Sequence, residues 1–112
     1  MKLQPFDIVV VPFPYADKLA EKRRPAVVIS EAVVSDKYKL AWLAMITSAT
    51  HPRWDCDVDI ADLKSTALPV PSRIRPVKIA TVDVARIVRR IGHLSAADTK
   101  ALKKKLLSFL PQ

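Results

Sequence analysis

The residues best suited to chemistry form a basic cluster, Lys22, Arg23 and Arg24, which one proline joins to an apolar run at 26–29. Four residues are too few for a helix, and the run is rich in Val and Ile, so it predicts a strand buried on both faces. Pro25 cannot donate to a central ladder, which places it first in that strand. Arg24 would then stand at the rim of the core, its guanidinium directed at solvent or at a ligand.

Other candidates for chemistry are few. His93 follows the only glycine, Gly92, in an expected strand, which favours a structural role. His51 lies in a polar loop after Thr47 and could titrate near neutral pH, and the alternative is a plain exposed loop residue. The sequence has no glycine-rich phosphate loop and no zinc-binding helix motif, so most enzyme classes are unsupported.

Residues 54–60 alternate strictly, which predicts a half-buried strand with Trp54, Cys56, Val58 and Ile60 inside and Asp55, Asp57 and Asp59 facing solvent. The three carboxylates would stand about 7 Å apart, too far for one small cation. A single cysteine excludes an intramolecular disulfide and leaves too few thiolates for a zinc site. This cysteine content is typical of a protein in a reducing compartment. We therefore expect no metal and no cofactor.

The net charge of +8 is concentrated near the C-terminus. Residues 1–70 hold nine Lys or Arg and nine Asp or Glu, whereas residues 71–112 hold ten and two. A basic surface of this kind attracts polyanions, so nucleic acid or an acidic protein is the expected partner. The alternative is a solvated surface without a ligand.

The 112 residues, half of them hydrophobic, fit one domain over 1–112. No apolar run approaches the roughly 20 residues of a membrane span, so we expect a soluble, cytoplasmic protein with no membrane contact. Strands are expected at 6–12, 26–29, 40–47, 54–60, 73–84 with an interruption at Pro76, and 88–94 with a bulge or turn at Gly92. A loop is expected at 13–23, and Asp62 can cap a short turn.

One strong helix is predicted near the C-terminus. It opens at Ser95, which resembles a capping box with Asp98, and an apolar face holds Leu102, Leu106, Phe109 and Leu110. Several short strands with one terminal helix predict a mainly β (α+β) fold, a small curled sheet or barrel.

A series of short motifs resembles the MazF/PemK-like toxins over nearly the whole chain: Asp7-Ile-Val, Phe13-Pro, Arg24-Pro25-Ala-Val-Val-Ile-Ser30, Ile46-Thr47-Ser48, Pro71-Ser-Arg-Ile-Arg75, Thr81-Val-Asp83 and Gly92-His-Leu-Ser95. The resemblance implies an SH3-like β-barrel, a small homodimer, and the toxin of a type II toxin–antitoxin module. It also implies metal-independent cleavage of single-stranded RNA to a 2′,3′-cyclic phosphate, and neutralisation by an acidic antitoxin through which any DNA contact would run.

Residue roles follow from the same resemblance. Arg24 and Thr47 match the family's catalytic arginine and the threonine ending the facing strand. The arginine would stabilise the phosphorane charge, and the threonine would donate to a phosphoryl oxygen or fix the arginine. Arg75 matches an arginine that some members use as general acid or charge stabiliser. RNA contacts are expected at Lys22, Arg23, Ser48, His51, Arg53 and Trp54, of which Trp54 would stack a base or else lie in the core.

Two positions depart from the family pattern. Val77 stands where some members carry an aspartate base, and Phe6 replaces the usual glycine before Asp7. The proton-abstracting group is therefore open between His51, a carboxylate of the 13–23 loop, and water. Val77 also favours the alternative function, a non-catalytic SH3-like barrel that binds RNA, DNA or an acidic peptide.

Overall fold

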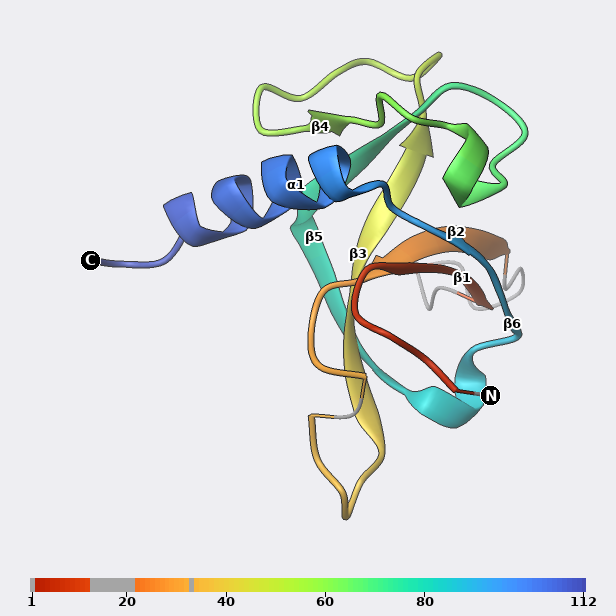
Figure 1. The fold of residues 1–112 in the computed structure, drawn as a ribbon. Coiled ribbons are helices and arrows are strands. Elements are labelled where there is room, and N and C mark those ends of the chain that lie inside the picture. Colours follow the sequence, from red (N-terminus) through yellow and green to blue (C-terminus); the bar gives the residue numbers. More distant parts are fainter. Residues whose placement is uncertain (1, 13–21, 33) are drawn as a thin grey trace.

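A curled antiparallel sheet of six strands makes up most of the computed structural model, which describes residues 2–12, 22–32 and 34–112 (Figure 1). The strands are β1 (Asp7–Pro12), β2 (Arg23–Val28), β3 (Leu40–Ser48), β4 (Val58–Asp59), β5 (Ser72–Asp83) and β6 (Arg89–His93). Their order in the sheet is β4-β5-β3-β2-β1-β6. Helix α1 (Ala96–Ser108) follows β6, which confirms the mainly β fold with a C-terminal helix.

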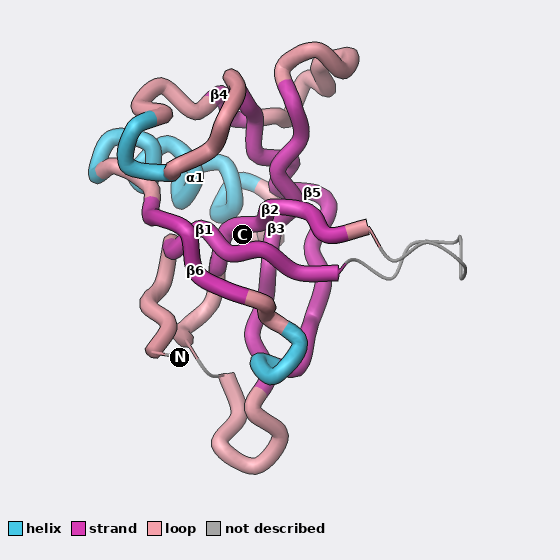
Figure 2. The backbone as a smooth tube through the Cα atoms, turned by 90° about the vertical axis from the view of Figure 1, so that its right-hand side faces the viewer, coloured by secondary structure: helices cyan, strands magenta, loops and turns pink. Residues whose placement is uncertain are grey.

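Different elements lie at the two ends of the sheet. Helix α1 and β4 lie together at one end, and the short 3-10 turn η2 (Val84–Arg86) lies at the other (Figures 1 and 2). A second 3-10 turn, η1 (Lys64–Thr66), has Leu63 and not the expected Asp62 as its N-cap, although the Asp62 carboxylate accepts from Lys64 N at 3.1 Å. Within the described part of the chain, no helix is long and apolar enough to cross a membrane.

Strands β1, β3 and β6 lie where the apolar runs predicted them, whereas β2 begins earlier than expected. Strand β2 pairs with β1 from Arg23 onward, but with β3 only from Ala26 to Val28. Pro25 is therefore third in the strand rather than first, and the strand tolerates it because no β3 residue pairs with it there. Of the predicted 13–23 loop, residues 13–21 lie outside the described residues, as does the Phe13-Pro motif.

The predicted interruption at Pro76 is a bulge inside one continuous strand. Met45 pairs with Arg75, whereas its neighbour Ala44 pairs with Ile79, so three residues of β5 have no counterpart on β3. A proline is tolerated at such a point because it removes no ladder hydrogen bond. Strand β5 therefore bends without ending.

The expected bulge at Gly92 is also present, because the register between β1 and β6 shifts just before this residue. A second reason for glycine is the close approach of η1. A Cβ added at Gly92 would lie 2.4 Å from the Ser65 carbonyl oxygen and 2.6 Å from the Thr66 carbonyl carbon. Only a residue without a side chain allows β6 to pack this closely on η1.

The predicted strand over residues 54–60 is wrong, because only Val58 and Asp59 form a strand there. Asp57 N donates to Trp54 O at 3.0 Å and closes a turn over the first four residues. This turn breaks the alternation, so Asp57 is buried instead of facing solvent and Trp54 is 41% exposed instead of lying in the core. Alternation alone could not reveal the turn.

The core consists of two apolar clusters, and α1 belongs to one of them. Leu102 is fully buried in the cluster that contains Ile8, Val27 and Ile74, and Leu106 packs against it. Ser95 caps the helix as predicted, accepting from Asp98 N at 3.1 Å, while the buried Asp98 carboxylate accepts from the backbone of 61 and 62. The helix ends at Ser108, so the expected continuation of its apolar face is wrong, and both Phe109 and Leu110 are exposed.

Candidate active site

A cleft opens where β2 and β3 separate. Their pairing begins at Ala26 and Met45, and the preceding residues of β2 and the following residues of β3 form the two walls. Two adjoining hollows, with volumes of about 550 and 270 Å³, share Arg24 from β2 and Thr47 from β3. The strand geometry thus places Arg24 and Thr47, two of the three sequence-predicted catalytic residues, on facing walls.

The lining of this cleft is cationic. The described residues that line the two hollows include no Asp or Glu, whereas they include Arg23, Arg24, Arg75, Lys78 and Arg89. Apolar side chains such as Leu68 and Val70 form part of the larger hollow. Among the described residues, no three His, Cys, Asp or Glu side chains gather as metal ligands would. The positive charge of the lining therefore favours an anionic ligand, and the apolar side chains favour a ligand that also has apolar parts.

Arg24 is available to such an anion. It pairs with Val11 through the backbone of β2 and is half-buried, which fixes the base of its side chain. No hydrogen bond or ion pair joins its guanidinium to another residue of the described ranges 2–12, 22–32 and 34–112. A planar guanidinium in that position can donate two parallel hydrogen bonds to a phosphoryl group.

Thr47 contacts His51 directly, with 2.8 Å between Thr47 Oγ1 and His51 Nδ1. The chain returns to Thr47 through a tight turn in which His51 N donates to Ser48 O at 3.1 Å. Ser48 supports the turn, because its Oγ accepts from Thr50 N at 3.2 Å and lies 2.9 Å from Thr50 Oγ1. Residues 47–51 are therefore a compact unit with its hydroxyl and imidazole side by side.

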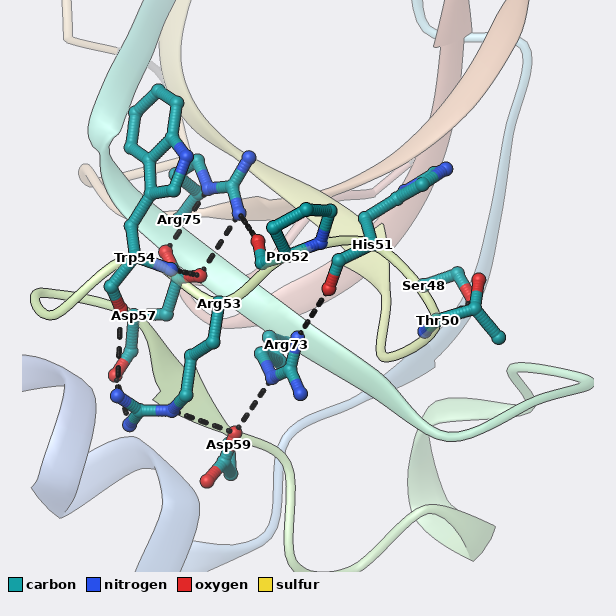
Figure 3. Close-up of polar contacts among 10 residues, drawn as sticks. All are labelled: Ser48, Thr50, His51, Pro52, Arg53, Trp54, Asp57, Asp59, Arg73 and Arg75. Atoms are coloured by element: carbon teal, nitrogen blue, oxygen red, sulfur yellow. Dashed lines mark hydrogen bonds and ion pairs between the residues drawn. The ribbon is translucent and has the colours of Figure 1, made fainter.

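Two arginines of β5 donate hydrogen bonds to backbone carbonyls of this loop (Figure 3). Arg73 donates from Nη1 to the His51 carbonyl at 2.8 Å and from Nε to Asp59 at 3.2 Å. Arg75 donates from Nη2 to the Pro52 carbonyl at 3.0 Å. The position of the loop is thus fixed by the strand next to the one that carries Thr47.

Arg75 itself is held by a buried ion pair. Its Nε and Nη2 donate to the two carboxylate oxygens of Asp57, both at 3.0 Å, and its guanidinium carbon lies 3.9 Å from the centre of the Trp54 ring. Burial raises the pKa of Asp57, but the hydrogen bonds from Arg75 and Trp54 N together with the positive charges of Arg75 and Arg53 outweigh it, so the pKa lies below its usual value. The same pair raises the pKa of Arg75.

The predicted site residues separate into two groups. The cleft is lined by Arg23, Arg24, Thr47, Ser48, His51 and Arg75. The lining does not include Lys22, Arg53 or Trp54. Arg53 turns instead toward the other side of its loop, where it donates to the Asp57 carbonyl at 3.0 Å and lies 3.7 Å from Asp59 (Figure 3).

Three basic residues at the site were not among the sequence predictions. Lys78 and Arg89 line the cleft, and Arg73 anchors the loop. The excess of basic residues after position 70 pointed to this region, but nothing in the sequence distinguished a lining arginine from a solvated one. The pairing of β5 and β6 with distant strands decides which of them reach the cleft.

The comparisons with known proteins agree on one family and fold. The family model described as PemK-like, MazF-like toxin of type II toxin–antitoxin system matches residues 4–110. A mycobacterial endoribonuclease in complex with its cognate antitoxin is similar in structure (TM-score 0.75, 12% identity, 99% of each chain covered). So is Mycobacterium tuberculosis toxin MazF-mt6 (TM-score 0.71, 22% identity, 91% of this chain and 93% of that one). MazF from Deinococcus radiodurans is also similar in structure (TM-score 0.72, 21% identity, 95% of this chain and 94% of that one covered). No curated protein matches the chain significantly.

Proposed function

Because the chain belongs to the PemK-like, MazF-like family of type II toxins, we propose that it is an endoribonuclease that cuts single-stranded RNA without a metal ion and arrests growth in the cytoplasm. The observation that carries this proposal is the placement of Arg24 and Thr47 on facing walls of a cleft whose described lining is cationic and lacks carboxylates. Such a cleft suits a phosphodiester backbone, and its apolar part suits a nucleobase.

Cleavage of this kind needs three events at one phosphate: the 2′-hydroxyl loses its proton, negative charge develops on the phosphorane, and the leaving 5′-oxygen gains a proton. Arg24 serves the second event, because its guanidinium has no hydrogen-bond or ion-pair partner among the described residues and can bind two phosphoryl oxygens as their charge grows. Thr47 supports it by donating its hydroxyl proton to a phosphoryl oxygen. Arg23 and Arg89 would hold neighbouring phosphates at the wider hollow.

We assign Arg75 a positioning role in this scheme. Its guanidinium is engaged by Asp57 and by the Pro52 carbonyl, so its direct part in charge stabilisation would be small. Its action would pass through the loop that it fixes. Lys22, Arg53 and Trp54 would contribute only at the periphery of a bound RNA, since none of them lines the cleft.

We further propose a homodimer whose cleft is covered by an acidic segment of an antitoxin. The net charge of +8 supports an acidic partner. Solved structures with this fold include a MazE–MazF assembly from Deinococcus radiodurans, similar to this chain with a TM-score of 0.73 and 20% identity. An acidic peptide would compete for the same cations that hold RNA.

The test is incubation of the purified protein with a long single-stranded RNA in excess chelator, followed by analysis of the fragment ends. We expect 2′,3′-cyclic phosphate and 5′-hydroxyl ends. Arg24→Ala should slow the single-turnover rate roughly 100- to 1,000-fold, as expected for loss of one oxyanion donor. Thr47→Ala should lose less than Arg24→Ala if its hydroxyl acts as one neutral donor.

Lys37→Ala is the matched control, because it removes one positive charge from the exposed turn at the opposite end of β3. An Arg24→Ala protein as active as this control would refute the assignment. If the protein retains RNA in a salt-sensitive manner but produces no fragments, the alternative function, a non-catalytic barrel that binds nucleic acid or an acidic peptide, replaces the enzyme. Val77, exposed on β5 where some members of the family carry an aspartate base, is the residue that favours this alternative.

A further inference from the structure

Among the described residues that line the cleft, one side chain is suited to accept a proton. We propose that His51 is the general base that removes the proton of the attacking 2′-hydroxyl, an inference that rests on the proposed ribonuclease function. His51 lines both hollows together with Arg24 and Thr47. It is exposed, so a bound RNA can reach its imidazole.

The composition of the cleft leaves His51 as the candidate. Arginine and lysine are protonated at neutral pH, and Thr and Ser hydroxyls are too weakly basic to take a proton. The described lining residues include no carboxylate. The nearby Asp57 and Asp59 are engaged by Arg75 and Arg73 on the far side of the loop. Among the described residues of this cleft, His51 is thus the only lining side chain that can act as a base.

The contact between His51 and Thr47 determines which nitrogen of the imidazole can accept a proton. If the Thr47 hydroxyl donates its proton to a phosphoryl oxygen, its oxygen must accept the 2.8 Å hydrogen bond, so His51 carries its proton on Nδ1. The lone pair of the neutral ring then lies on Nε2, the nitrogen that this contact leaves unengaged. One continuous chain of hydrogen bonds would run from the imidazole through Thr47 to the scissile phosphate.

Hydrogen bonds fix the backbone on both sides of the His51 side chain. Arg73 holds the His51 carbonyl at 2.8 Å and the backbone N–H of His51 bonds to Ser48 at 3.1 Å, so both ends of the residue are fixed. Figure 3 shows the imidazole directed away from Arg73 and Arg75, on the side of the loop opposite the Asp59 contacts. A base held in this way needs little reorganisation when RNA binds.

The step balances as a transesterification. Nε2 takes the 2′-hydroxyl proton while the 2′-oxygen forms a bond to phosphorus and the bond from phosphorus to the 5′-oxygen breaks. The 5′-oxygen takes a proton from water, and the imidazolium returns its proton to the solvent. The products are a 2′,3′-cyclic phosphate and a 5′-hydroxyl, with no oxidant, reductant or metal consumed.

The charged groups around His51 allow a clear pH test. Those that share its hollows are Arg23 and Arg24 of β2, Arg75 and Lys78 of β5, and Arg89 of β6. Arginine and lysine keep their charge between pH 5 and about 9. A rise of the single-turnover rate with pH in that range, as the base loses its proton, would therefore report His51.

The experiment compares His51→Gln with His93→Gln, which changes the only other histidine, exposed at the end of β6. We expect His51→Gln to lower the single-turnover rate roughly 100-fold or more. It should also abolish the rise of rate with pH, while the melting temperature stays unchanged. His93→Gln should keep the wild-type single-turnover rate and its rise with pH. In His51→Ala, imidazole added at millimolar concentration should restore part of the activity and the rise with pH.

Each other outcome has a distinct meaning. If the wild type cleaves RNA and His51→Gln cleaves at the same rate with the same pH profile, His51 is not the base and the ribonuclease proposal stands. If His51→Gln is slow but keeps the rise with pH and His51→Ala is not rescued, His51 only orients Thr47, and the base assignment is overturned. If the wild type does not cleave RNA in chelator, the proposed function fails and the base assignment fails with it.

Discussion

Replacement of Asp57 by asparagine tests the ion pair that holds the loop of the candidate site. The Asp57 residue is only 3% exposed, and its carboxylate accepts two hydrogen bonds from Arg75 and one from Trp54 N at 2.9 Å. Asparagine keeps the size and one carbonyl oxygen. It loses the negative charge, and its NH2 group replaces an oxygen that accepts hydrogen bonds from Arg75 or from Trp54 N.

The expected loss of stability is about 3 kcal/mol. Removing one member of a buried pair costs roughly 3–5 kcal/mol, because the remaining charge is left without a partner. The lower end applies here, since the asparagine carbonyl still accepts one bond and Arg75 keeps its 3.0 Å contact with the Pro52 carbonyl. Asp57→Asn combined with Arg75→Met should therefore lose much less than the sum of the two single changes.

Urea unfolding followed by tryptophan fluorescence measures this loss, and the Trp54 ring stacked on Arg75 reports on the loop directly. Asp59→Asn is the matched control. Its side chain lies two residues away, contacts Arg73 and Arg53, and is 65% exposed, so less than about 1 kcal/mol is expected. An Asp57→Asn protein no less stable than Asp59→Asn would refute the role given to the buried pair.

The pH dependence supplies a second check. The pKa of Asp57 in the folded protein lies below its ordinary 3.8, so the unfolded state binds the proton more readily. The contribution of the charged pair is therefore fully present well above pH 3.8 and declines as the pH falls through the lowered pKa. The difference in unfolding free energy between wild type and Asp57→Asn should be constant from pH 7 to about pH 5 and shrink at more acidic pH.

Three further changes test the packing and charge around the cleft. Gly92→Ala should destabilise the fold by about 3 kcal/mol in urea unfolding, because the added Cβ meets backbone atoms of η1 at 2.4 Å. Ala67→Gly should stabilise it by about 1 kcal/mol in the same assay, because Ala67 has a left-handed φ of 58°. Arg89→Gln should weaken RNA binding and lower the slope of log affinity against log salt by about 1.

Each of these changes has a result that would contradict it. A Gly92→Ala protein with wild-type stability would mean that η1 can move away from β6. A loss of stability in Ala67→Gly would mean that the alanine side chain contributes more than its backbone conformation costs. An unchanged salt slope in Arg89→Gln would mean that this arginine does not bind a phosphate.

Local sequence signals were sufficient for most of the secondary structure. The apolar runs that predicted β1 and β3, and the serine that predicted the start of α1, act over only a few residues. Arg24 and Thr47 were expected beside such runs, and each lies one residue inside the end of its strand. Their meeting across one cleft additionally required the antiparallel order of β2 and β3.

The parts that the sequence did not reveal depend on residues far apart in the chain. Asp57 was expected at the surface because the pattern 54–60 alternates, yet Arg75, 18 positions later, draws it into the interior. The anchoring of His51 by Arg73 spans 22 positions. Neither pairing leaves a periodic signal, because each depends on how β5 is set against β3, and the bulge at Pro76 shifts that register.

The fastening of the site loop to β5 has a mechanical consequence. Thr47 lies in β3, and Thr47 pairs directly with Arg73, the residue that holds the carbonyl of His51. The Thr47 hydroxyl, the His51 imidazole and the Arg73 guanidinium therefore belong to one unit built on the paired strands β3 and β5. We expect bending of the sheet to move these three groups together. Arg24 lies outside this unit, on the part of β2 that precedes its pairing with β3 at Ala26, so the distance from Arg24 to Thr47 can change when the sheet bends.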